Sequence, residues 1–252
     1  MSRALRSLAA PLCLLAVWEL TCRFGHVSPA ILPPPTQVAR KWVEYLRSGE
    51  LFADTWATFM RVCVGFAIGA GLALPLGLWM GARDKVYSVL NPLIQLLRPI
   101  PPIAYIPLSI LWFGLGNPPA FFLIALGAFF PVLMNTIAGV RNVDAIYVRV
   151  AQNLGANSST LFRRVLLPGA MPSILSGLRI GVGVAFICVI VAEMIAVNSG
   201  LGYRILEARE YFWSDKIIAG MVSIGVLGLA IDSGMARLND RLLRWRRGIE
   251  SA

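Results

Sequence analysis

The sequence predicts an all-α polytopic membrane protein, and two observations carry this prediction. The 252-residue chain is 57% hydrophobic and 14% charged, with a mean hydropathy of +0.70, whereas a soluble domain is about a quarter charged. Several apolar stretches approach or exceed the ~20 residues that a helix needs to cross a bilayer. We therefore expect a single transmembrane domain, residues 1–252, with about six transmembrane helices.

The predicted spans are separated by proline, glycine and charged residues. They cover residues 7–24, 62–82, 97–116, 119–140, 177–197 and 216–236. We interpret the first as a retained span rather than a signal peptide, because Glu19 and Arg23 bound it and no small-x-small cleavage site follows. A proline-rich turn at 31–38 and an amphipathic helix at 37–47 come next, while residues 83–91 are expected to form a loop.

Two spans have an unusual composition. Span 62–82 is rich in glycine, which predicts close helix packing because small residues let backbones approach. Span 97–116 contains four prolines, and broken backbone at membrane depth is tolerated only where it is buried in protein or lines a wet cavity. Two interpretations of this span stay open: a proline kink covered by neighbouring helices, or a part of a transport pathway.

Composition also argues against several kinds of site. Cys13, Cys22, Cys63 and Cys188 lie in or beside apolar runs without a CxxC, so we interpret them as small hydrophobes. His26 is the only histidine, which leaves little for a zinc site or a serine–histidine triad, and no metal is expected. The formal charge of +10 indicates cytoplasmic loops and contact with anionic membrane lipids rather than nucleic acid.

A polar, basic loop at 141–176 separates the fourth and fifth spans. Its first part has an apolar helix stripe at Ile146, Val150 and Leu154. Asp144 suits the first turn of this helix, and Gly155 stands where a left-handed C-cap is needed. The loop therefore begins with a short helix that ends at Gly155.

The second part of the loop predicts another short helix. Residues 157–159 offer N-caps for a helix at about 159–167, and Pro168 and Pro172 are expected to end it. Small residues around Gly155 would let another surface approach closely. This helical hairpin is either a docking surface for a protein or an amphipathic element facing lipid.

Six spans place both termini, residues 83–91 and the polar loop on one side of the membrane. That side carries most of the 23 Lys and Arg residues, including a basic C-terminal tail. By the positive-inside rule, the polar loop and both termini are cytoplasmic.

The spacing of the hairpin resembles the signature loop of permease subunits of bacterial ATP-binding cassette importers. That motif runs Glu-Ala-Ala, three residues, Gly, nine residues, Ile, one residue, Leu-Pro. Here Gly155 is followed by nine residues, then Val165, Leu166, Leu167 and Pro168. The glutamate of the motif falls on Arg149, which is similar to members of one branch of the family.

That branch comprises the permeases for taurine, alkanesulfonates and nitrate, and the resemblance to it covers most of residues 28–235. The stretches that carry it are 31–38, 61–81, 97–116, 167–186 and 192–203. The resemblance implies a type I importer permease fold in the bacterial cytoplasmic (inner) membrane. It also implies transport of a small anionic solute such as taurine, a sulfonate or nitrate.

The resemblance further implies partners. They are a second copy of this chain, two ATPase subunits that bind ATP and Mg²⁺, and a periplasmic or lipid-anchored substrate-binding protein. The chain itself has no GxxxxGK[ST] motif and is expected to bind no cofactor. Residues 143–168 would form the coupling loop.

Eight residues of this loop are the candidate ATPase-coupling surface. They are Arg149, Ala151, Gln152, Leu154, Gly155, Ala156, Leu167 and Pro168. Arg163 and Arg164 contact either the ATPase or lipid phosphate, and both alternatives stay open.

Five residues are candidates for the substrate pathway or its gate: Glu193, Arg98, Arg179, Pro101 and Pro102. An acid at membrane depth is a functional candidate, and Glu193 is either a gate or a structural partner of Arg204. Arg98 and Arg179, expected near the inner face, either ease anion exit or anchor the protein at the cytoplasmic side.

Two other classes were compared with the importer subunit. An ion-coupled secondary transporter acting alone would need charged residues deep in the spans, and the sequence offers few beyond Glu19 and Glu193. An intramembrane enzyme would need a catalytic dyad or a metal site. The sequence has one histidine, no clear catalytic dyad and no metal-ligand spacing.

Overall fold

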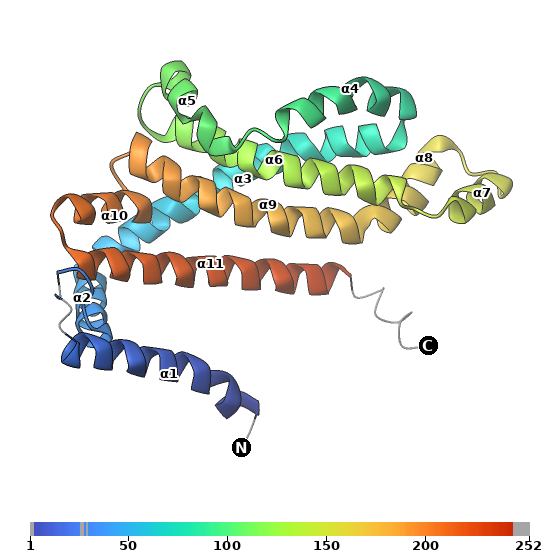
Figure 1. Ribbon diagram of the computed structural model, residues 1–252. Coiled ribbons are helices and arrows are strands. Elements are labelled where there is room, and N and C mark those ends of the chain that lie inside the picture. Colours follow the sequence, from blue (N-terminus) through green and yellow to red (C-terminus); the bar gives the residue numbers. More distant parts are fainter. Residues whose placement is uncertain (1–2, 26–27, 29, 244–252) are drawn as a thin grey trace.

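The computed structural model describes residues 3–25, 28 and 30–243, and these residues form helices joined by short connections (Figure 1). His26 and the basic tail beyond residue 243 lie outside the described residues. The elements are α1 (Arg3–Phe24), α2 (Pro35–Arg47), α3 (Glu50–Ala82), α4 (Asp84–Leu97), η1 (Pro102–Tyr105), α5 (Ile106–Phe113), α6 (Asn117–Arg141), α7 (Ala145–Asn153), α8 (Ser158–Leu161), η2 (Phe162–Leu166), α9 (Leu167–Ala196), α10 (Leu201–Glu210) and α11 (Ser214–Leu242).

The core is built around α6, which packs along both α3 and α9. Close packing with α3 depends on glycine, as predicted. A Cβ added to Gly69 would lie 2.3 Å from the carbonyl oxygen of Ala125, and one added to Gly77 would lie 2.7 Å from the Cβ of Thr136. Any larger side chain at these positions would force the two helices apart.

The predicted spans agree with the helices in most places. Four helical runs among the described residues are long and apolar enough to cross a membrane, and a fifth is reached if a bent pair counts as one span. The four are α3, α6, the run from α8 through α9, and α11. They contain the predicted spans at 62–82, 119–140, 177–197 and 216–236, except for residue 197. The predicted span at 7–24 lies within α1, a helix that is not among these apolar runs.

The third predicted span, 97–116, is not a single helix. The structure instead has α4 followed by the segment Pro102–Phe113, with a bend of 80° between them. The expected loop at 83–91 is wrong, because residues 84–91 lie within α4 and Arg83 is its N-cap. Val86, Tyr87, Leu90 and Ile94 recur at helical spacing and pack against the core, which stabilises a helix despite the charges at its start.

The expected end of the hairpin's second helix is also wrong. α8 continues through η2, a π-helix, into α9, so the helical run that contains the predicted fifth span begins at Ser158 and is not interrupted before residue 177. Pro168 lies in the first turn of α9, and the wider π-helical turn before it accommodates the missing N–H of this proline. Pro172 lies inside α9 and does not end it.

The two ends of the bundle differ in character. The hairpin formed by α7 and α8 projects from one end, where α11 also finishes, whereas α2 and α10 cover the opposite end (Figure 1). Helix α2 confirms the predicted helix at 37–47 and begins at Pro35. Helix α10, which the sequence did not suggest, packs against both α9 and α11.

Candidate functional site

Helix α7 is fixed at both ends by local hydrogen bonds. At its start, the carboxylate of Asp144 accepts a hydrogen bond from the backbone N–H of Ile146 at 2.9 Å. At its end, Ala156 donates to the carbonyl of Ala151 at 3.0 Å, and Gly155 donates to that of Gln152 at 2.9 Å. These two bonds form a Schellman motif, which requires the left-handed φ of +79° that Gly155 adopts.

The second helix of the hairpin is capped in the same local way. The side chain of Asn157 accepts a hydrogen bond from the backbone N–H of Thr160 at 2.8 Å. A Cβ added to Gly155 would meet nothing within 4 Å, so the turn between the helices borders open space. The hairpin therefore has a defined shape that does not depend on packing around Gly155.

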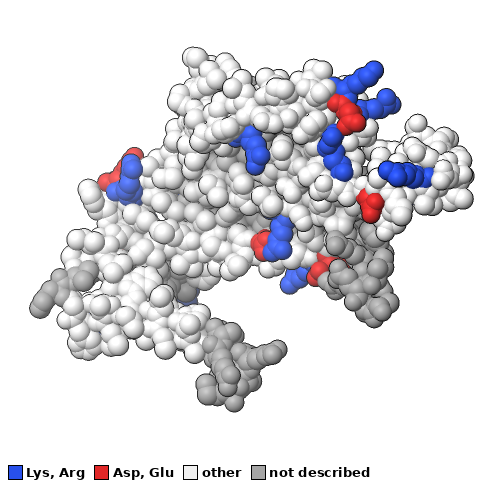
Figure 2. Space-filling view, turned by 45° about the vertical axis from the view of Figure 1, so that its right-hand side comes forward, with Lys and Arg blue, Asp and Glu red and all other residues white. Residues whose placement is uncertain are grey.

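The predicted apolar stripe of α7 is present and lies on the surface. Ile146 is 59% exposed, Val150 is 51% exposed and Leu154 is 83% exposed. Basic side chains gather over the same end of the molecule (Figure 2). A contiguous apolar surface with a basic surround is typical of a contact site for a protein or a membrane.

The structure groups six of the eight candidate coupling residues. Arg149, Ala151, Gln152, Leu154, Gly155 and Ala156 all lie on α7 or in the turn that ends it. Leu167 lies apart from them, at the start of α9, where it packs against the buried cluster around Val140 and Ala170. Pro168 follows in the first turn of α9, so both residues support the hairpin rather than form its exposed surface.

A second polar site lies at the opposite end of α3 and α9. Its buried members are Asp54, Thr58, Arg61 and Glu193, which we call the charge cluster; each is at most 6% exposed. The guanidinium of Arg61 donates to Glu193 with an Nη1–Oε1 distance of 2.7 Å. Thr58 donates to the same carboxylate, at 2.9 Å and 3.0 Å from its two oxygens.

The charge cluster joins four parts of the chain. Arg61 also donates to Asn117 at the start of α6, and to the carbonyl and hydroxyl of Ser199 in the loop before α10. The backbone N–H of Gly202 donates to Glu193 at 2.9 Å. These bonds satisfy the buried charges, and they hold α10 and its loop against α3 and α9.

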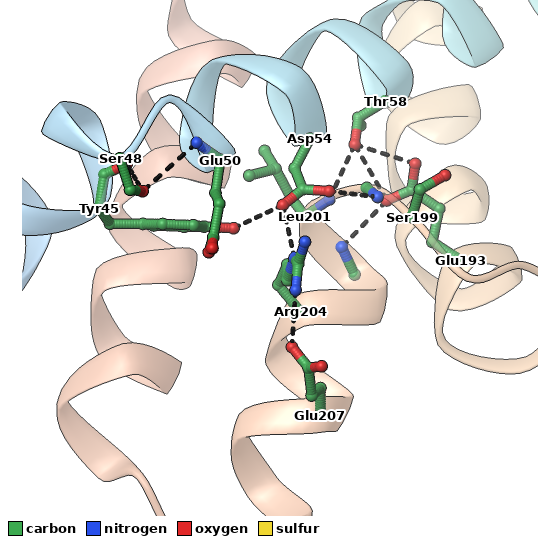
Figure 3. Close-up of polar contacts among 12 residues, drawn as sticks. Tyr45, Ser48, Glu50, Asp54, Thr58, Glu193, Ser199, Leu201, Arg204 and Glu207 are labelled. Atoms are coloured by element: carbon green, nitrogen blue, oxygen red, sulfur yellow. Dashed lines mark hydrogen bonds and ion pairs between the residues drawn. The ribbon is translucent and has the colours of Figure 1, made fainter.

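Asp54 forms the outer layer of the charge cluster (Figure 3). Its carboxylate accepts hydrogen bonds from Arg204 at 2.7 Å, from Tyr45 at 2.6 Å and from the backbone N–H of Gly200 at 2.9 Å. Burial and the bond to Asp54 raise the pKa of the Tyr45 phenol well above its ordinary value. Tyr45 therefore stays protonated and continues to donate at physiological pH.

The structure corrects the suggested pairing of Glu193 with Arg204. Arg204 pairs with Asp54 and Glu207, while Glu193 pairs with Arg61. Burial lowers the pKa of Arg204, but the hydrogen bonds that Arg204 donates to Asp54 and Glu207 outweigh this effect and raise it. The sequence signal that was missed is the spacing of residues 54, 58 and 61, which places three polar side chains on one face of α3.

The remaining pathway candidates lie in separate places. Arg179 of α9 donates to both carboxylate oxygens of Asp232 on α11, each at 2.7 Å. Arg98 follows the last residue of α4, and Pro101 and Pro102 follow in the bend. In the described part of the chain, no three His, Cys, Asp or Glu side chains come together as a metal site would need.

Comparisons with known proteins agree with this architecture. Residues 73–244 match the family of binding-protein-dependent transport system inner membrane components. The chain is 38% identical to a putative aliphatic sulfonates transport permease of Bacillus subtilis strain 168, over 98% of this chain and 89% of the relative. It is 37% identical to the taurine transport system permease of Escherichia coli K12, over 94% of this chain and 88% of the relative.

A solved structure with the same fold supports this architecture. It is an inward-facing form of the MetNI methionine ABC transporter, which aligns with a TM-score of 0.66 and 18% sequence identity. The alignment covers 75% of this chain and 94% of the other chain. The match confirms the predicted all-α fold class of type I importer permeases.

Proposed function

This chain belongs to the family of binding-protein-dependent transport system inner membrane components and is an ABC permease, and we propose that it imports a small sulfonate or a similar anion. The support is the likeness along nearly the whole chain to relatives named for aliphatic sulfonates and taurine. Nitrate is a further candidate, because a nitrate import permease of Synechocystis sp. PCC 6803 is 31% identical over 94% of this chain.

The energy for transport comes from a separate ATPase subunit, which binds ATP and Mg²⁺. This subunit binds α7. Leu154 and its apolar neighbours enter a groove of the ATPase, and Arg149 and Gln152 contact the rim of that groove. The observation that carries this proposal is an apolar stripe that is exposed while its helix is capped at both ends. Such a rigid surface loses little conformational entropy when a partner binds.

The hairpin is connected directly to a membrane span. The helical run from Ser158 to Ala196 contains 39 residues, so at 1.5 Å per residue it is about 58 Å long. Near its far end, Glu193 is locked to Arg61 of α3. Movement of the ATPase therefore acts on one long helix whose opposite end holds the charge cluster, as a rigid-body switch requires.

The assembled importer contains two copies of this chain, two ATPase subunits and a substrate-binding protein. The hairpin and both termini face the cytoplasm of a bacterial cell, because the basic residues concentrate at that end. The binding protein docks at the opposite end, which α2 and α10 cover. The single chain has no ATPase activity of its own.

The substitution Gly155→Glu tests the coupling proposal. The new side chain has room in the free chain, although a non-glycine residue is strained at a φ of +79°. The control below carries the same strain, so the difference between the two variants reports interference with a docked partner. We expect loss of co-purification with the ATPase and a fall in ATP-driven uptake of roughly tenfold or more, equivalent to about 1.4 kcal/mol of binding energy.

Gly49→Glu is the matched control for this experiment. Gly49 has the same φ of +79° and also meets nothing within 4 Å, but it lies at the start of α3. The control should keep the ATPase bound and uptake intact. Unchanged assembly and uptake in Gly155→Glu would contradict coupling through the hairpin.

A further inference from the structure

The bend between α4 and α5 leaves an interruption of the helical backbone. α4 ends at Leu97 and η1 begins at Pro102, and the two helical segments are bent by 80°. Pro99, Pro101 and Pro102 have no N–H, so this segment lacks three backbone donors that a helix would use. A membrane protein tolerates such a break only where it is covered by protein or reached by water.

The break lies alongside the middle of α6 rather than at either of its ends (Figure 1). Because α6 is long and apolar enough to cross a membrane, this position is near the middle of the membrane. Ile94, one turn before Arg98, packs in the core cluster that contains Ala70 and Ala73 of α3. Residues 62–82 of α3 carry no charge, and Ala70 and Ala73 flank the midpoint of that stretch. Arg98 lies about 6 Å further along the chain, which is deeper than the inner-face position expected from the sequence.

Arg98 differs from the other arginines at membrane depth. Arg61 donates to Glu193, and Arg179 donates to Asp232. Arg98 is exposed, and no acid among the described residues lies within ion-pair distance of its guanidinium. A lone cation at this depth is costly in lipid, so such a residue normally faces a protein interior or a water-filled cavity.

The broken backbone and the lone cation occur at the same point. The cation requires a polar environment there, and a water-lined cavity is one of the two settings in which the broken backbone is tolerated. We propose that Arg98 lines the substrate pathway and binds the anionic group of the substrate at mid-membrane. This proposal rests on the proposed function, which it deepens by naming the residue that selects for negative charge. A guanidinium suits this role because it donates to sulfonate, carboxylate or nitrate oxygens through two parallel hydrogen bonds.

The first test measures uptake of radiolabelled ethanesulfonate, taurine and nitrate by the complete importer in liposomes. Arg98→Gln should lower uptake at least tenfold while ATPase activity stays within about twofold of wild type. Arg98→Lys, which keeps the charge, should retain at least a third of wild-type uptake. Lys85→Gln is the matched control at the start of the same helix, and it should transport normally.

The second test asks whether water reaches this position. Arg98→Cys is made in a background in which Cys13, Cys22, Cys63 and Cys188 are replaced by alanine, and water-soluble thiol reagents are applied. A cationic reagent should restore uptake, and an anionic reagent should leave it blocked. Arg98→Gln could lower uptake and ATPase activity together. In that case, rescue by the cationic reagent and not by the anionic reagent shows that the missing positive charge is the cause.

Two results would overturn the proposal: uptake by Arg98→Gln within twofold of wild type, or no labelling of the cysteine by either reagent. Failure of the proposed function is distinct, because the wild-type complex would then take up none of the three solutes. Labelling needs no substrate, so it decides whether Arg98 faces water in that case as well.

Discussion

The coupling hairpin and the charge cluster are held in opposite ways. The hairpin is fixed by bonds between near neighbours, such as Ala156 to Ala151, and it exposes its apolar side chains. In the charge cluster, Arg61 and Glu193 are 132 residues apart, and both side chains are buried. The hairpin is thus an exposed surface that a partner can bind, whereas the charge cluster is a set of tertiary contacts between distant helices. Changes in the first should weaken binding, and changes in the second should weaken folding.

The largest expected effect is in the charge cluster. Glu193→Ala leaves Arg61 charged, buried and without its carboxylate, which should cost roughly 3–5 kcal/mol of unfolding free energy. The measurement is unfolding of the detergent-solubilised chain by sodium dodecyl sulfate.

The double variant Glu193→Leu with Arg61→Met is the control for this effect, because it removes both charges. It should recover most of the lost stability. A double variant as unstable as Glu193→Ala would show that the unpaired charge of Arg61 does not cause the loss of unfolding free energy.

The same substitution can then be compared in the two regions. Gly200→Ala would place a Cβ 2.2 Å from a carboxylate oxygen of Glu193, at a φ of +104°, and should cost at least about 2 kcal/mol. Gly155→Ala has a positive φ but open space, so it should cost about 1 kcal/mol. Equal losses of unfolding free energy in Gly200→Ala and Gly155→Ala would contradict the proposed difference between the buried charge cluster and the exposed hairpin.

The sequence predicted the hairpin better than the charge cluster because the hairpin's bonds are local. Asp144 and Gly155 act within a few residues. Residue type and spacing predicted the C-cap at Gly155, whereas Asp144, expected as an acid in the first turn, is the N-cap of α7. The apolar stripe of α7 also follows directly from helical periodicity.

The charge cluster could not be predicted in this way. The choice between Arg61 and Arg204 as partner of Glu193 depends on how α3, α9 and α10 pack, which no local pattern encodes. The same limit applies to α4, where charged residues suggested a loop and tertiary packing of Ile94 stabilises a helix. Pro168 also misled the prediction, because the π-helix before α9 lets the helix continue with this proline in the first turn of α9.

A smaller effect is expected on binding alone. Leu154→Ala should weaken capture of the ATPase by about 1–2 kcal/mol, since Leu154 is the most exposed residue of the apolar stripe. The unfolding free energy of the Leu154→Ala permease should equal that of the wild type. The matched control is Leu111→Ala on α5, where the side chain is 78% exposed, and ATPase binding should there be unaffected.

The smallest effect is expected at the start of α7. Asp144→Ala removes the N-cap and should destabilise the helix locally by about 1 kcal/mol. Hydrogen exchange of the amide of Ile146 and its neighbours should become faster. Asp144→Asn should preserve slow exchange, because asparagine also accepts the capping bond; equal exchange in both variants would argue against the cap.

Cross-linking in membranes tests most directly whether the hairpin is the site that the ATPase grips. A photo-reactive residue is placed at Leu154, and another at Phe52, which is 73% exposed at the opposite end of the molecule. If the hairpin is the ATPase-binding site, position 154 forms a cross-link to the ATPase subunit and position 52 forms none. No cross-link from position 154, or equal cross-linking from both positions, would contradict this binding site.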